Sequence, residues 1–109
     1  MNKRPLPDWL RLWFQRALLD EIYPAIRPIA VGFSESRALT TRVYLDREPT
    51  DDDRENMSCV LTEIFANTSS NDEITESIEE LVASDLPLSK LDPLDGFVYA
   101  RREYDLNTA

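Results

Sequence analysis

The spacing of hydrophobic residues changes near the middle of the chain, and this change limits the possible folds more than any other feature. Over residues 39–46, apolar and polar side chains alternate, which is typical of a half-buried β-strand. Over residues 57–65, apolar residues recur at steps of three and four, which is typical of one helix face. Thr50 is a suitable N-cap, and Asp53 three residues later comes close to a capping box. The sequence therefore predicts a strand followed by a helix that ends near Asn67.

A helix and another strand are predicted before this pair. Asp8 suits an N-cap, and residues 9–22 place apolar side chains at three- and four-residue steps. Residues 26–33 are typical of a strand, and the polar turn at residues 34–37 connects it to residues 39–46. The two strands predict an antiparallel hairpin, which needs a helix or further strands packed against it to be stable.

The last third of the chain contains the least certain element. Over residues 73–84 the apolar spacing favours a helix, although a strand at residues 78–83 also fits. Residues 88–96 alternate leucines with prolines and aspartates, and we expect this loop to pack its leucines onto the core. Residues 97–104 predict the last strand.

The length predicts one domain, residues 1–109, with an extended lead at residues 1–7 and a frayed tail from residue 105. Cys59 is the only cysteine, so no internal disulfide can form. No segment approaches the ~20 apolar residues that a membrane-spanning helix needs. We therefore expect a cytoplasmic protein in a reducing environment.

The residue types that the chain lacks argue against an enzyme. Without histidine, it lacks the commonest general base and metal ligand. Gly32 and Gly96 are its only glycines, so it cannot form a glycine-rich phosphate-binding loop. The acidic composition also disfavours direct binding to nucleic acid phosphates. We expect no catalytic residues, no cofactor and no metal site.

The negative charge is concentrated in residues 55–89, which contain eight acidic residues and no lysine or arginine. This stretch accounts for −8 of the formal net charge of −9. Like charges held together repel, and a basic partner would relieve that repulsion, although a solvated acidic face that aids solubility fits equally well. The predicted partner-binding residues are Asp72, Glu73, Glu76, Glu79, Glu80 and Asp85.

Four segments resemble a group of small bacterial immunity proteins, the CdiI-like family of contact-dependent growth inhibition. They are residues 44–50, 84–85, 91–92 and 95–104. The resemblance implies an α+β domain in the order α-β-β-α-β-β, with an antiparallel sheet of about four strands packed against two helices. It favours a strand near residues 78–84. It also implies a cytoplasmic protein that neutralises the basic C-terminal domain, often a nuclease, of an exported toxin.

Two other functions are compatible with the sequence. One is a small acidic regulatory or adaptor domain that binds a basic protein without inhibiting it. The other is a metal-dependent hydrolase that uses Asp92 and Asp95, although aspartates in such turns more often cap their own turn. A neighbouring gene that encodes a very large secreted protein would favour immunity over the adaptor role, and a lack of stabilisation by Mg²⁺ or Mn²⁺ would exclude the hydrolase.

Overall fold

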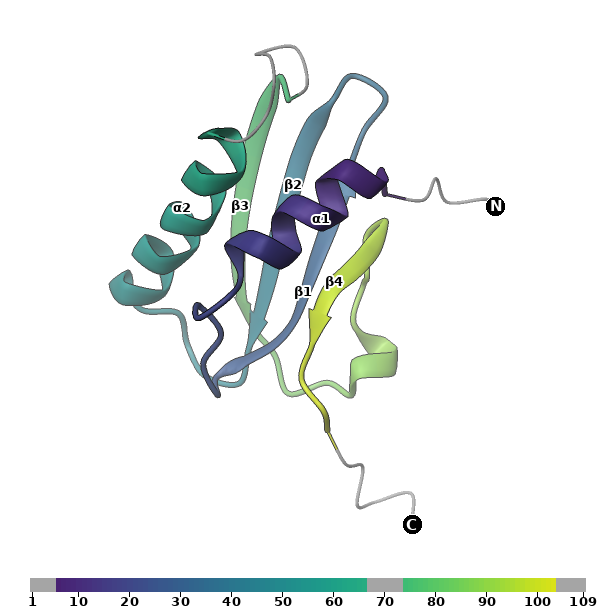
Figure 1. Ribbon diagram of the computed structural model, residues 1–109. Helices are drawn as coiled ribbons and strands as arrows, with labels where there is room; N and C mark the ends of the chain where they lie inside the picture. Colours follow the sequence, from purple (N-terminus) through teal and green to yellow (C-terminus); the bar gives the residue numbers. More distant parts are fainter. Residues whose placement is uncertain (1–5, 67–73, 104–109) are drawn as a thin grey trace.

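A computed structural model of the chain describes residues 6–66 and 74–103. Two helices lie against one face of a four-stranded sheet (Figure 1), so the expected α+β class and the order α-β-β-α-β-β are confirmed. Among the described residues, no helix is both long enough and apolar enough to cross a membrane. The elements are α1 (Asp8–Ala17), β1 (Ile26–Phe33), β2 (Ala38–Leu45), α2 (Asp51–Ala66), β3 (Glu76–Ala83), a short 3-10 helix (Leu88–Lys90) and β4 (Gly96–Ala100).

The sheet is mixed, whereas the expectation was an antiparallel sheet. Its strand order is β3-β2-β1-β4, and β1 is antiparallel to both of its neighbours. β3 is parallel to β2, in an unbroken register from Ala38 opposite Glu76 to Leu45 opposite Ala83. The reason lies in the connection, because α2 carries the chain back along the sheet and so forms a strand–helix–strand crossover.

The element that the sequence left open is a strand, β3, as the resemblance favoured and the periodicity did not. Its apolar residues lie on both sides of the sheet. Leu81 packs against the main core, whereas Ile78 and Val82 are 42% and 36% exposed. An edge strand with apolar residues on both faces does not alternate cleanly, which explains the helix-like spacing.

The first helix is shorter than predicted. It ends at Ala17, and the chain then turns through Asp20, whose φ of 67° lies in the left-handed region that ends a helix. Pro7 occupies the N-cap position, and Asp8 is the first helical residue and not the cap. An acidic residue in the first turn still interacts favourably with the helix dipole.

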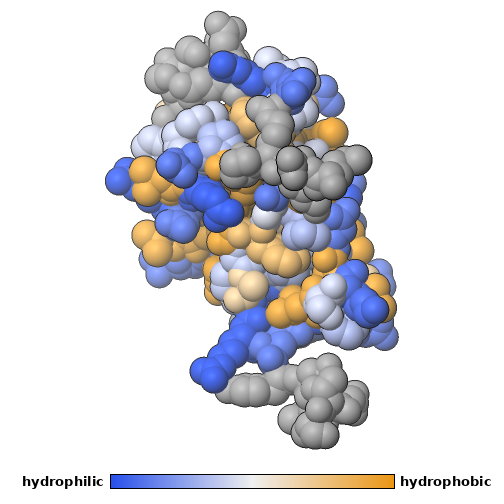
Figure 2. Space-filling model, turned by 90° about the vertical axis from the view of Figure 1, so that its right-hand side faces the viewer, coloured by the Kyte–Doolittle hydropathy of each residue, from blue (hydrophilic) through white to orange (hydrophobic). Residues whose placement is uncertain are grey.

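The main core lies between the sheet and the two helices. Phe14 from α1, Ile29 and Val43 from the central strands, and Leu61 and Ile64 from α2 are almost fully buried. Figure 2, a view from the β4 side, shows hydrophobic side chains that reach the surface between hydrophilic ones across the middle of this face.

A second cluster covers the face of the sheet that the helices leave open. Leu91 is buried against Ala30 and Tyr44, and Leu88 and Leu94 pack around them. The Tyr44 hydroxyl donates a hydrogen bond of 2.9 Å to the carbonyl oxygen of Asp92. The prediction that the leucine-rich loop packs onto the core is therefore confirmed, although it packs on the second face.

Helix α2 begins at the predicted capping box. Asp53 accepts the Thr50 N–H at 2.8 Å, and the Thr50 hydroxyl accepts the Asp53 N–H at 3.2 Å. Both terminal nitrogens of Arg47 also donate to Asp53, at 2.6 and 3.1 Å, and the Tyr23 hydroxyl donates to the same carboxylate.

The Arg47 guanidinium holds the pKa of Asp53 well below its usual value. Burial and the neighbouring carboxylate raise the pKa of Tyr23 to about 12.

A buried arginine connects three separate segments at the end of the sheet. Arg27 of β1 donates two hydrogen bonds to Glu103, at 2.8 and 2.7 Å, and one of 2.9 Å to the carbonyl oxygen of Ser84. Arg101 adds contacts to Asp46 and Glu103. The Arg27 side chain is 5% exposed, so its charge needs this compensation. The Arg27 hydrogen bonds hold the pKa of Glu103 below its usual value.

Asp53→Asn is expected to lower the free energy of unfolding at pH 7 by about 2 kcal/mol, because it weakens both a cap and the ion pair between the buried Asp53 carboxylate and Arg47. The native pKa of Asp53 lies below its unfolded value. Its contribution is therefore fully present above about pH 4 and is lost as the pH falls further. Urea unfolding between pH 7 and pH 2 measures this loss. The variant should show a shallower decline than the unmodified protein.

Asp52→Asn is the matched control, because Asp52 is exposed in the same helical turn. It should lower stability by about 0.5 kcal/mol, the effect of one carboxylate on the helix dipole. Equal pH profiles for the two variants would contradict the assigned role of Asp53.

Glu103→Gln is expected to lower the free energy of unfolding by about 3 kcal/mol, because it leaves the buried Arg27 guanidinium without a counter-charge. Thermal and urea denaturation measure the difference, with Glu48→Gln, a substitution of an exposed residue, as the control. Equal stability of these two variants would show that the Arg27 charge is compensated elsewhere.

Candidate functional site

The predicted partner-binding residues that the structure describes lie along or just after β3. Glu76, Glu79 and Glu80 belong to the strand, and Asp85 follows its end by two residues. Asp72 and Glu73 lie outside the described residues. β3 is an edge strand, so it presents these carboxylates at the boundary of the sheet.

The pairing with β2 shows which face of the sheet each β3 side chain occupies. Glu80 lies opposite Arg42 and Val82 opposite Tyr44, on the face that carries the second cluster. Glu79 alternates with these positions and therefore lies on the helix side. The carboxylates of β3 thus occupy both faces of one edge.

One of the predicted carboxylates is already neutralised within the protein. Glu80 accepts a hydrogen bond of 2.7 Å from Nε of Arg42, and the same guanidinium lies 3.7 Å from Asp92. Within residues 6–66 and 74–103, Glu76, Glu79 and Asp85 form no salt bridge. The sequence could not reveal that Glu80 differs from the other three carboxylates, because Arg42 and Glu80 are 38 positions apart.

Exposed apolar side chains accompany these carboxylates, although they were not among the predicted site residues. Ile78, Val82 and Leu86 are 42%, 36% and 50% exposed. The alternation of Glu76, Ile78, Glu80 and Val82 along one face is the signal that could have found them, once residues 76–83 are read as a strand. We call these residues together the β3 surface: Glu76, Ile78, Glu79, Glu80, Val82, Asp85 and Leu86.

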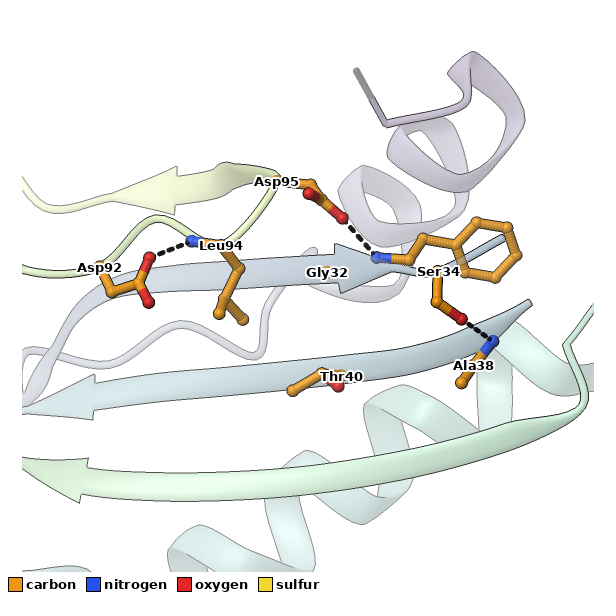
Figure 3. A pocket seen from close by; sticks show the side chains of 8 residues that line it. Gly32, Ser34, Ala38, Thr40, Asp92, Leu94 and Asp95 are labelled. Atoms are coloured by element: carbon orange, nitrogen blue, oxygen red, sulfur yellow. Dashed lines mark hydrogen bonds between the residues drawn. The ribbon is translucent and has the colours of Figure 1, made fainter. Parts of the chain in front are cut away.

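A shallow hollow of about 410 Å³ lies between the start of β2, the end of β1 and the loop before β4 (Figure 3). Two aspartates line it, and each accepts a backbone hydrogen bond. Asp95 accepts the Phe33 N–H at 2.7 Å, and Asp92 accepts the Leu94 N–H at 2.9 Å. Asp92 therefore caps its own turn, as expected of turn aspartates, whereas Asp95 connects the loop before β4 to the end of β1.

The geometry gives little support to a metal-dependent hydrolase. In the part of the chain that the structure describes, no three or more acidic or cysteine side chains are grouped so as to hold a metal ion. Cys59 is exposed on α2. The strongest candidate site is therefore the β3 surface, which has the features of an interaction surface.

Comparison with known proteins identifies the family. A family model described as "MafI2 immunity protein" matches residues 7–103, a segment that includes both helices and all four strands. No curated protein matches the chain. The expected relation to immunity proteins is therefore confirmed, whereas the subtype of contact-dependent growth inhibition stays a prediction. The matched segment spans most of the sequence, and the chain belongs to the MafI2 immunity protein family.

Proposed function

We propose that this protein neutralises one cognate toxin domain by binding it through the β3 surface, and that it catalyses no reaction itself. Membership of an immunity protein family supports the inhibitory role. The observation that carries the choice of surface is a set of carboxylates that form no salt bridge with any described residue, Glu76, Glu79 and Asp85, beside exposed apolar residues of the same edge.

The charge of this surface indicates the chemistry of the partner. A toxin domain that cleaves nucleic acid binds phosphates through lysine and arginine. Carboxylates placed where phosphates would bind form short, charge-assisted hydrogen bonds with the same guanidinium groups. The proposed partner is therefore the basic C-terminal nuclease domain of an exported toxin, of the kind delivered in contact-dependent growth inhibition, and the proposed site of neutralisation is the cytoplasm.

The carboxylates and the apolar residues are expected to contribute differently to binding. Opposite electrostatic potentials mainly raise the rate of association, up to about 10⁸–10⁹ M⁻¹s⁻¹ at low salt. The lifetime of a complex depends more on buried anchors, and Ile78, Val82 and Leu86 are the exposed aliphatic residues of the surface. Rapid capture by charge and slow release by apolar contact suit a protein that must act before a toxin causes damage.

The double substitution Glu76→Gln/Glu79→Gln is expected to slow association with the toxin domain by about tenfold at low ionic strength, because it removes two carboxylates that no described residue neutralises. Surface plasmon resonance at several salt concentrations measures the rate. The toxin domain is taken from the reading frame next to this gene. Growth rescue of cells that express this toxin domain measures neutralisation, and the variant should rescue growth less well.

Asp8→Asn/Asp20→Asn is the matched control, since it removes the same charge from exposed positions on α1 and in the turn after it. Asparagine also tolerates the left-handed conformation of residue 20. The control should bind and rescue like the unmodified protein. Equal effects of the two double variants would refute the β3 surface as the binding site. Tight binding without growth rescue would instead favour an adaptor role.

A further inference from the structure

The outer edge of β3 is a strand edge to which no described residue is paired. β3 has eight residues and contains no proline, and among the described residues it pairs only with β2. α2 packs against β3 from the helix side, which covers a face of the strand. Backbone groups directed away from β2 are therefore a template for another strand.

The hydrogen bond that follows β3 indicates which backbone groups point outward. Ser84 donates its N–H to the carbonyl oxygen of Leu45, at 3.0 Å. Because successive residues of a strand direct their backbone groups to opposite sides and the register with β2 is unbroken, the even-numbered residues of β3 face β2. The outward-facing N–H and C=O groups are therefore those of Ser77, Glu79, Leu81 and Ala83.

The charge of this edge determines which strand it accepts. A second copy of this chain would bring an equally acidic strand against β3, and the carboxylates of the two strands would repel. A strand that carries lysine or arginine beside Glu76 on the open face and beside Glu79 on the helix side would pair with the same carboxylates. Charged residues on an edge strand often prevent pairing with other chains. Ile78 and Val82 are also exposed along this edge, and such apolar residues would favour contact with a partner strand.

We propose that the toxin domain supplies an extended cationic strand that pairs with the outer edge of β3 and adds a fifth strand to the sheet. The inference rests on the proposed toxin-binding function and specifies how the β3 surface is used. Lysine or arginine side chains of the added strand lie beside Glu76 and Glu79. Aliphatic side chains of the same strand lie beside Ile78 and Val82 on the open face. Backbone hydrogen bonds hold the two chains together, and the side chains select the partner.

Amide hydrogen exchange of the unmodified protein, free and bound to the toxin domain, tests this arrangement. In the free protein, the amides of residues 78, 80 and 82 should exchange slowly, and those of residues 77, 79, 81 and 83 rapidly. In the complex, exchange of the second set should slow by about a hundredfold or more, because each of these amides gains a partner. Rapid exchange of the second set in the complex would overturn the proposal. Slow exchange of that set in the concentrated free protein would also overturn it, since a second copy would then occupy the edge.

Ser77→Pro provides an independent test, because it removes one outward N–H without changing the charge. It should weaken the complex about tenfold, the effect of one lost hydrogen bond, while Ser77→Ala changes affinity by less than about twofold. Thermal denaturation of both variants verifies that each is folded. Equal affinities of two folded variants would overturn strand pairing. If binding stays sensitive to Glu76→Gln/Glu79→Gln in that case, the proposed function itself stands.

Discussion

The buried charge of Arg27 is the constraint on which the arrangement of the sheet edges depends. A guanidinium that is almost completely removed from water must be neutralised and hydrogen-bonded, and here Glu103 and the Ser84 carbonyl oxygen fulfil this requirement. Ser84 directly follows β3, and Glu103 lies just beyond β4. One side chain of a central strand therefore holds the ends of both edge strands. The β3 surface has a defined position because its last residues are held in this way.

The acidic residues of this chain fall into two groups with different physical roles. One group has structural roles. Asp53 caps the start of α2, Glu103 neutralises the buried Arg27, and Asp95 accepts a backbone hydrogen bond at the end of β1. Glu76 and Glu79 form no such contact within residues 6–66 and 74–103. These two carboxylates lie at the open edge of the sheet, and they belong to the surface that we propose binds the toxin domain.

Much of the architecture could be predicted from local patterns, and the parts that could not depend on distant contacts. The alternation over residues 39–46, the stripe over residues 57–65 and the Thr50 cap are local signals, and the structure confirms all three. β3 escaped prediction by periodicity because an edge strand need not bury one face. The parallel pairing of β2 with β3, and the ion pair of Arg42 with Glu80, join positions 38 residues apart. No local pattern records such a pairing.

The exposure of most β3 side chains has an evolutionary consequence. Among the β3 residues, Leu81 packs against the main core, while Glu76, Ser77, Ile78 and Glu79 are exposed. Substitutions at exposed positions usually change stability by less than about 0.5 kcal/mol. Mutations along this strand can therefore accumulate with little selection against misfolding. A scaffold of this kind is suited to rapid divergence, in which descendants keep the same architecture and acquire immunity to different toxins.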